Sequence, residues 1–101
     1  METVTKREMV ETIQGRLKAK HPTLGHQAVL DIVDEWVGEV QTILSAGKRI
    51  ELRGFGVFVP KARAARLARN PKTGAPVQVP PRKTVVFQPG KDFKIKLAAS
   101  V

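Results

Sequence analysis

The sequence predicts an α+β protein with a helical body, a three-stranded antiparallel sheet, a long protruding β-ribbon arm and a short C-terminal helix. Two observations support this class. Apolar residues recur at helical spacing in the first half of the chain and alternate with polar residues in the second half. Residues 61–83 hold seven Lys or Arg and no Asp or Glu. We expect a single domain over residues 1–101, with a helical part at 5–47 that takes part in oligomerisation.

The first helix has a clear start signal. Thr5 followed by Glu8 is a capping box, in which the Thr side chain accepts a hydrogen bond from the backbone of the first helical turn. Val4 before the cap can pack on Met9 as a hydrophobic staple. These residues predict a helix that begins at Lys6.

A second, longer helix follows the break at His21–Pro22, with Thr23 as its expected N-cap and Gly47 as its stop. Its apolar stripe is wide: Ala28, Val29, Ile32, Val33, Trp36, Val37, Val40, Ile43 and Leu44. The first helix cannot cover this stripe, and fewer than 80 residues remain outside the arm to form a core. We therefore expect oligomerisation, with part of the stripe facing a partner subunit.

The sheet is expected from residues 48–60 and 84–89. Arg49–Arg53 alternates polar and apolar residues, a glycine-rich turn leads into the next strand, and Thr84–Phe87 alternates again. A short basic helix is expected at 90–98. Three aromatic side chains should fill the core between sheet and helices: Phe55, Phe58 and Phe87.

The arm, residues 61–83, separates its cations with small residues and offers almost no apolar face, so it should protrude into solvent. Its strands could reach about 40 Å at roughly 3.3 Å per residue. Asn70–Gly74 is expected to form the turn at the tip, and the return strand to continue through Pro80–Pro81. An isolated ribbon is only marginally stable, so the arm needs a polyanion to hold it.

Charge divides the chain in the same place. Residues 1–47 hold five Lys or Arg and seven acids, which give a net charge of −2. Residues 48–101 hold thirteen Lys or Arg and two acids, which give a net charge of +11 and a total of +9 for the chain. The first half is predicted to build the body and the second half to meet an anion.

Several classes are disfavoured by what the sequence lacks. There is no Cys, so disulfides and Cys-based zinc sites are excluded. No apolar run approaches the roughly 18 residues of a membrane span, and we expect an intracellular protein without membrane contact. His21 and His26 are poorly spaced for a metal, and no catalytic constellation or phosphate loop is evident. We predict no enzyme activity, no cofactor, no metal and no small-molecule substrate.

These features together resemble the bacterial HU/IHF family of histone-like DNA-bending proteins. The resemblance rests on two helices, Gly54–Phe58, the basic arm with Arg69–Gly74, and Phe87–Lys91 in that order. It implies an intertwined dimer in the cytoplasmic nucleoid, whose two arms wrap double-stranded DNA. A homodimer is expected, with a heterodimer with a paralogue as the alternative. The Arg49–Arg53 pattern is slightly more similar to IHF than to HU.

Pro71 is the first candidate functional residue. The resemblance implies that its rigid apolar ring enters the minor groove and wedges between base pairs. By itself, Asn-Pro-Lys-Thr-Gly is ordinary turn chemistry, and Pro71 would then only shape the loop. Its position at the tip of a basic, apolar-poor arm favours the wedge.

The other expected DNA contacts are cations and tip residues: Arg49, Arg53, Lys61, Arg63, Arg66, Arg69, Asn70, Lys72, Thr73, Arg82, Lys83 and Lys91. Arg suits phosphate and narrow minor grooves because its planar fork donates two hydrogen bonds. Glu51 is expected either to hold an Arg for a minor-groove contact or to form a surface ion pair. The family usually has Gly where this chain has Ala68, which would strain a backbone that needs positive φ.

Three alternatives remain open at this point. A basic protein could coat DNA without preference or strong bending, it could bind RNA, or the arm could pair with other proteins. RNA binding is disfavoured because the arm has no aromatic side chain on which single-stranded bases could stack. A protein partner would have to be strongly acidic to match the arm's charge.

Overall fold

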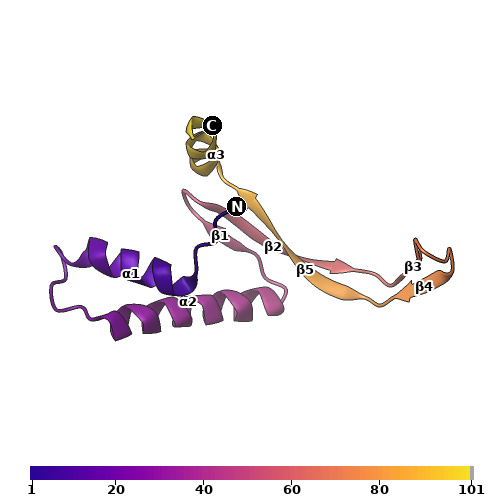
Figure 1. Ribbon diagram of the computed structural model, residues 1–101, viewed down its shortest axis with the longest axis horizontal. Helices are drawn as coiled ribbons and strands as arrows, with labels where there is room; N and C mark the ends of the chain where they lie inside the picture. Colours follow the sequence, from indigo (N-terminus) through magenta and orange to yellow (C-terminus); the bar gives the residue numbers. More distant parts are fainter. Residues whose placement is uncertain (101) are drawn as a thin grey trace. The chain divides into compact units, whose positions relative to one another are not determined.

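In the computed structural model, which describes residues 1–100, the predicted α+β class is confirmed; the last residue of the expected domain lies outside the described part. The elements, shown in Figure 1, are α1 (Lys6–Leu17), α2 (His26–Ser45), β1 (Ile50–Leu52), β2 (Gly56–Arg63), β3 (Arg66–Arg69), β4 (Pro76–Val79), β5 (Arg82–Pro89) and α3 (Lys91–Ala99). The chain divides into two compact units, residues 1–41 and residues from 42 onward. A single domain remains a prediction.

The first unit is a helical hairpin whose start follows the sequence prediction. The Glu8 backbone N–H donates to the Thr5 hydroxyl oxygen at 3.3 Å, and α1 begins at Lys6. An ion pair of 2.7 Å between Lys6 and Asp34 links α1 to α2. Val10, fully buried, and Val29, 2% exposed, form the core of this unit. Two buried side chains make a very small core, as expected for a unit that needs a partner.

The predicted start of α2 was wrong. Thr23 does not cap the helix, which begins at His26, and the Gly25 carbonyl accepts the Val29 N–H at 3.3 Å. The Leu24 N–H donates instead to the His21 carbonyl at 3.1 Å, so that Thr23 is held in a preceding turn. The rigid φ of Pro22 favours this turn before the helix can begin.

The end of α2 agrees with the sequence prediction. Gly47 has φ +81°, its N–H donates to the Leu44 carbonyl at 3.0 Å, and the Lys48 N–H donates to the Ile43 carbonyl at 3.2 Å. These two bonds satisfy carbonyls that the last helical turn leaves without partners, and the left-handed conformation suits Gly best.

The second unit is built on an antiparallel sheet in the order β1-β2-β5. Phe58 and Phe87 are directly paired across β2 and β5, with ring centroids 4.8 Å apart, and Phe55 lies 4.9 Å from Phe87. Phe93 of α3, which the sequence analysis did not select, joins this cluster at 5.4 Å from Phe55. The aromatic core thus fastens α3 to the sheet.

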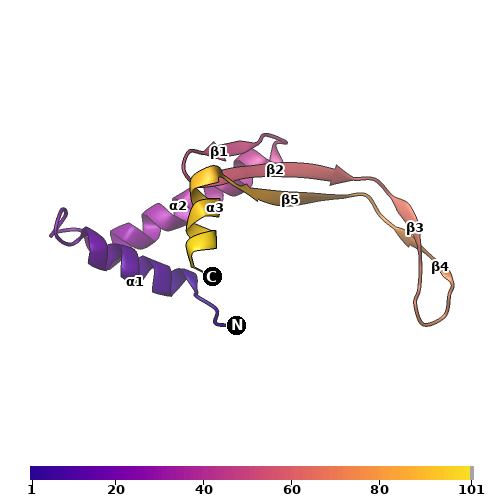
Figure 2. The ribbon, with the colours of Figure 1, turned by 90° about the horizontal axis from the view of Figure 1, so that it is seen from above.

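The ladder of β2 and β5 extends further than the predicted sheet. It continues past residues 60 and 84 into the predicted arm, as far as the pair Arg63 and Arg82. Both views show these strands side by side along this length (Figures 1 and 2). The prediction ended the sheet where apolar residues end, but ladder hydrogen bonds join backbone groups and need no buried face.

Gly56 permits a close approach within this unit. A Cβ at this position would lie 2.5 Å from the Gln88 carbonyl oxygen and 2.8 Å from the Phe87 ring. We therefore expect Gly56→Ala to lower the free energy of unfolding by about 2–3 kcal/mol, as overpacking does. The matched control is Gly15→Ala in α1, where a Cβ meets nothing within 4 Å; it should raise stability by about 0.5–1 kcal/mol. Urea unfolding followed by circular dichroism measures both, and equal effects would contradict the packing argument.

An apolar groove of about 640 Å³ runs between α1 and α2 within the first unit. Its walls include Ile32, 62% exposed, Trp36, 49% exposed, and Met9, 53% exposed. Large apolar side chains left open to this degree on one face mark an interaction surface. The groove agrees with the expectation that part of the α2 stripe faces a partner subunit.

Candidate nucleic-acid interface

The arm consists of two consecutive ladders and not of one continuous ribbon. β2 and β5 end at the pair Arg63 and Arg82, and β3 and β4 resume at the pair Arg66 and Val79. The expected passage of the return strand through Pro80–Pro81 was therefore wrong. Two consecutive prolines have no N–H to donate, so the ladder cannot be maintained opposite them. In Figure 1, β3 and β4 form the outer end of the arm, beyond this break.

Hydrogen bonds close the tip of the arm at Asn70. Its N–H donates to the Ala75 carbonyl at 2.9 Å, and its carbonyl accepts the Gly74 N–H at 2.7 Å. Gly74 has φ +70°, the left-handed conformation that the sequence analysis assigned to it. The loop between Asn70 and Ala75 is thereby fixed at both of its ends.

Side chains inside the loop hold it further. The Lys72 N–H donates to the Asn70 side-chain oxygen at 2.9 Å, and the Ala75 N–H donates to the Thr73 hydroxyl oxygen at 3.3 Å. These oxygens are occupied by backbone groups, so Asn70 and Thr73 act first as supports of the loop. Pro71 is exposed at its apex.

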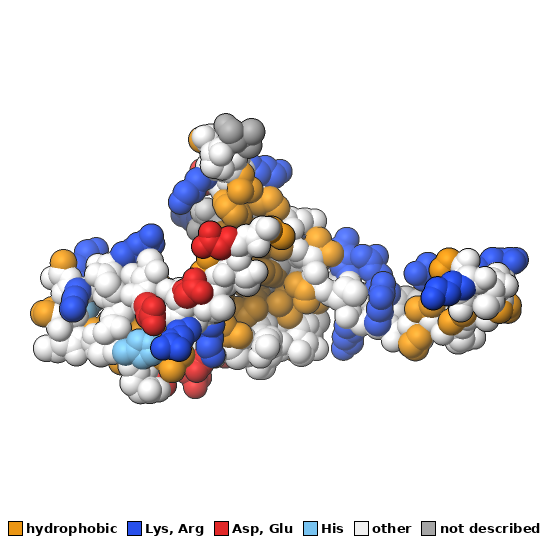
Figure 3. Space-filling model, viewed as in Figure 1, with side chains coloured by type: hydrophobic (Ala, Val, Ile, Leu, Met, Phe, Trp, Pro, Cys, Tyr) orange, Lys and Arg blue, Asp and Glu red, His pale blue; other side chains and the backbone are white. Residues whose placement is uncertain are grey.

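All seven cations of the arm are exposed: Lys61, Arg63, Arg66, Arg69, Lys72, Arg82 and Lys83. Within residues 1–100, ion pairs form only between Lys6 and Asp34 and between Arg7 and Glu11, both in the helical unit. Figure 3 shows the Lys and Arg side chains in blue along the arm, with no acidic side chain among them on that face. The arm therefore presents uncompensated positive charge, which favours binding to a polyanion.

Further exposed cations lie on the second unit, some at the base of the arm and one at the start of α3. Lys61 and Lys83 line a shallow cavity of about 170 Å³ together with Leu44 and Gly47 from the end of α2. Lys91 is exposed at the first position of α3, which begins without a side-chain cap at Gly90. The free backbone N–H groups of a helix start attract anions, and Asp92 in the same turn offsets part of the positive charge there.

Arg49, Glu51 and Arg53 are exposed as expected for one face of a strand. Only Glu51 lies within β1, and the two arginines flank its ends. The expected ion pair was wrong, since neither of the ion pairs in the described part of the chain includes Glu51.

Ala68 replaces the family's usual Gly without backbone strain. It lies in β3, paired with Val77, and among residues 1–100 every residue with positive φ is a Gly.

Two wider searches bear on other functions. Among residues 1–100, no cluster of three or more His, Cys, Asp or Glu side chains is arranged to hold a metal ion. Within the same residues, each helix is too short or too polar to span a bilayer.

Comparisons with known proteins identify the family of this chain. The family model described as bacterial DNA-binding protein matches residues 4–98. The integration host factor subunit beta of Halorhodospira halophila is 41% identical over 97 residues, which cover 96% of this chain and 91% of that protein. The same subunit of Edwardsiella ictaluri is 41% identical over 91 residues, 90% of this chain and 93% of that one.

Solved structures share the same fold. The Anabaena HU–DNA cocrystal structure is 26% identical, with a TM-score of 0.77 over 94% of this chain and 98% of that chain. An HU variant from Thermotoga maritima, 21% identical, shares the fold with a TM-score of 0.62 over 93% and 99% of the two chains. The chain therefore belongs to the bacterial DNA-binding protein family of HU and integration host factor, and is a non-enzymatic architectural DNA-binding protein.

Proposed function

We propose that this protein bends and compacts double-stranded DNA as a dimer, with Pro71 of each arm inserted into the minor groove. The observation that carries the proposal is the exposed proline at the apex of a hydrogen-bonded loop, on an arm with seven cations and no acid. A fixed loop suits a wedge because little conformational freedom is lost when the ring enters the base stack.

The cations supply the affinity. Arginines of the arm bind phosphates or enter the electronegative minor groove, and neither contact requires a particular base. Unstacking a base step costs a few kcal/mol, and this cost is offset when the bent duplex reaches further protein surface. Lys61, Lys83 and Lys91 are exposed on the second unit and offer such a duplex further positive charge.

The helical unit supplies the dimer. The open groove that includes Ile32 and Trp36 gives a partner subunit an apolar surface to cover. Family members form dimers, and the relatives named above are subunits of integration host factor, so a heterodimer with a paralogous chain is the alternative to a homodimer. A DNA-compacting role supports a location in the cytoplasmic nucleoid.

Salt titration tests the choice of polyanion. Binding to duplex DNA, duplex RNA of the same sequence and an acidic protein is measured at several salt concentrations. We expect the tightest binding and the steepest salt dependence for duplex DNA, because the deep, narrow major groove and the shallow minor groove of A-form RNA fit the arms poorly. Equal or tighter binding to RNA would support the RNA-binding alternative instead.

Arg69→Ala tests the phosphate contacts close to the tip. Arg69 is exposed and paired with Pro76 in the last rung of the outer ladder. We expect the slope of log K against log salt concentration to fall by about one for each arm, as for one lost phosphate contact. Lys94→Ala in α3 is the control with the same charge change and should leave the slope nearly unchanged. An unchanged slope for Arg69→Ala would place this side chain away from the DNA backbone.

A further inference from the structure

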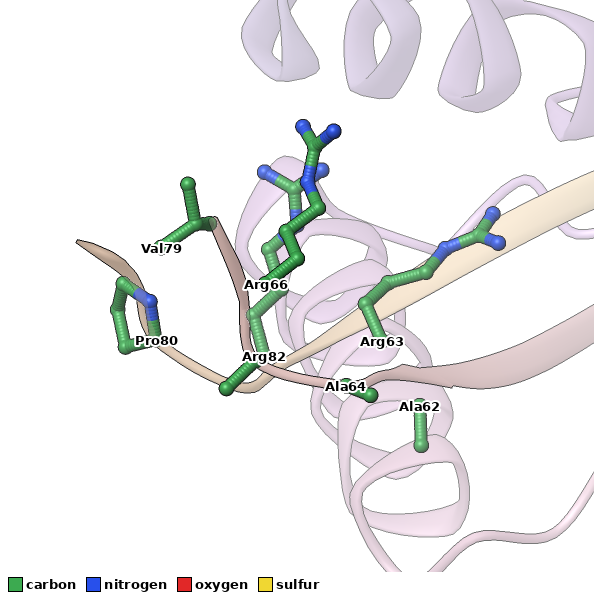
Figure 4. A pocket seen from close by; sticks show the side chains of 8 residues that line it. Ala62, Arg63, Ala64, Arg66, Val79, Pro80 and Arg82 are labelled. Atoms are coloured by element: carbon green, nitrogen blue, oxygen red, sulfur yellow. The ribbon is translucent and has the colours of Figure 1, made fainter. Parts of the chain in front are cut away.

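The break in the arm brings three arginines from three strands around one hollow. Arg63 ends β2, Arg66 begins β3 and Arg82 begins β5, and all three line a concavity of about 530 Å³ together with Pro80. Figure 4 shows their side chains projecting to the same side of the ribbon. This grouping is a property of the break and not of the arm as a whole.

A continuous strand could not make this grouping. Side chains alternate between the two faces of a strand, so residues three apart, such as Arg63 and Arg66, point to opposite faces. Ala64–Ala65 and Pro80–Pro81 interrupt both strands by two residues each, and the pairing resumes at Arg66 and Val79 without a shift of register. The interruption lets the outer ladder turn relative to the inner one, and Arg66 then joins the hollow that Arg63 and Arg82 share.

The cross-strand pair is unfavourable without a ligand. Arg63 and Arg82 are direct partners in the last rung of the inner ladder, and like charges placed opposite each other destabilise a sheet. The arm, residues 61–83, contains no Asp or Glu that could lie between them. An anion in the hollow would remove this repulsion and accept hydrogen bonds from several guanidinium groups at once.

We propose that Arg63, Arg66 and Arg82 together clamp a single phosphate group, and that Pro80–Pro81 builds the clamp by breaking the arm. The ligand is a phosphodiester of the DNA backbone, so this inference rests on the proposed function and adds a fixed anchoring point between the body and the wedge. Pro80 forms part of the wall and keeps the ladder open, because it has no N–H with which to close it.

Nuclear magnetic resonance of the guanidinium Nε–H groups tests the clamp without DNA. Inorganic phosphate is added to the full-length protein while chloride keeps the ionic strength constant. We expect the signals of Arg63, Arg66 and Arg82 to shift along one common binding curve, and the signal of Arg69 to shift clearly less. Separate curves, or shifts no larger than that of Arg69, would overturn the clamp.

Two variants test how the clamp is built. Arg82→Gln should weaken phosphate binding at least several-fold at both remaining arginines of the clamp. The double variant Pro80→Val with Pro81→Thr restores two N–H groups. In this variant the Arg66 signal should no longer follow the phosphate-binding curve that the Arg63 and Arg82 signals still share. All of these positions are exposed, so the variants should fold. If Arg66 stays on the common curve in the double variant, the prolines do not build the clamp.

Salt-dependent DNA binding separates a clamp from three independent contacts. Replacing Arg63, Arg66 and Arg82 together with Gln should lower the salt slope by about one for each arm if they share a phosphate, and by about three if each binds its own. Bending is measured on the same proteins. If the salt slope of the triple variant falls by about three for each arm while the wild-type protein bends DNA, the clamp is overturned and the proposed function stands. If the wild-type protein binds DNA without bending it, the proposed function is refuted and the clamp is not.

Discussion

Pro71→Ala is expected to remove most of the DNA bending and to leave most of the affinity. The wedge is lost, but the arm's seven cations remain, and the variant no longer spends energy on unstacking. We expect the bend-dependent energy transfer to fall by more than about half and the Kd to rise by no more than about threefold, because phosphate contacts dominate affinity. The measurement is fluorescence energy transfer between the ends of a duplex of about 35 base pairs, which is stiff when free.

Pro76→Ala is the matched control for this experiment. Pro76 is exposed on the same arm and pairs with Arg69 next to the tip, but it lies outside the Asn70–Ala75 loop. It should bend DNA as the wild type does. If Pro71→Ala also bends DNA normally, Pro71 is only a turn residue. If the wild-type protein binds DNA without any rise in energy transfer, it coats DNA and does not bend it.

Trp36→Ala is expected to weaken the dimer more than any other single change considered. Trp36 is 49% exposed in the isolated chain and lies on the wall of the apolar groove, so a partner subunit that fills the groove would bury it. Truncation of a buried Trp costs about 3–5 kcal/mol. At about 1.4 kcal/mol for each factor of ten, the dimer dissociation constant should rise by at least about 100-fold.

Sedimentation equilibrium measures this constant, and thermal unfolding at several protein concentrations supports it, since the midpoint of a dimer rises with concentration. Glu35→Gln, an exposed neighbour on α2 that does not line the groove, is the control and should leave the constant close to that of the wild type. A wild-type chain that is a stable folded monomer would contradict the dimer itself. An unchanged constant for Trp36→Ala would place the interface elsewhere.

The sequence determined those features whose causes lie within a few residues of each other. The cap at Thr5, the glycine stop at Gly47 and the tip turn around Gly74 each depend on hydrogen bonds between near neighbours. The basic arm was predictable because a run of like charges without acids cannot be buried. The family resemblance followed from the order of the two helices, Gly54–Phe58, the arm with Arg69–Gly74, and Phe87–Lys91.

Other features depended on contacts between distant parts of the chain. Thr23 has the right chemistry for a cap, but the turn around Pro22 holds it outside α2. Phe93 gives no signal in its own short helix and joins the aromatic cluster only because α3 packs on the sheet. The ion pair considered for Glu51 does not form, because side-chain spacing along one strand does not establish which groups meet.

The arm shows the division between sequence and tertiary structure most clearly. Its charge and its proline tip follow from the residues alone. The break in the ladder could not be predicted without the register of the two strands. That register places Pro80–Pro81 opposite Ala64–Ala65 and pairs Arg63 with Arg82. Strand periodicity would have separated Arg63 from Arg66, and only the tertiary structure, through the interrupted ladder, brings them to one hollow.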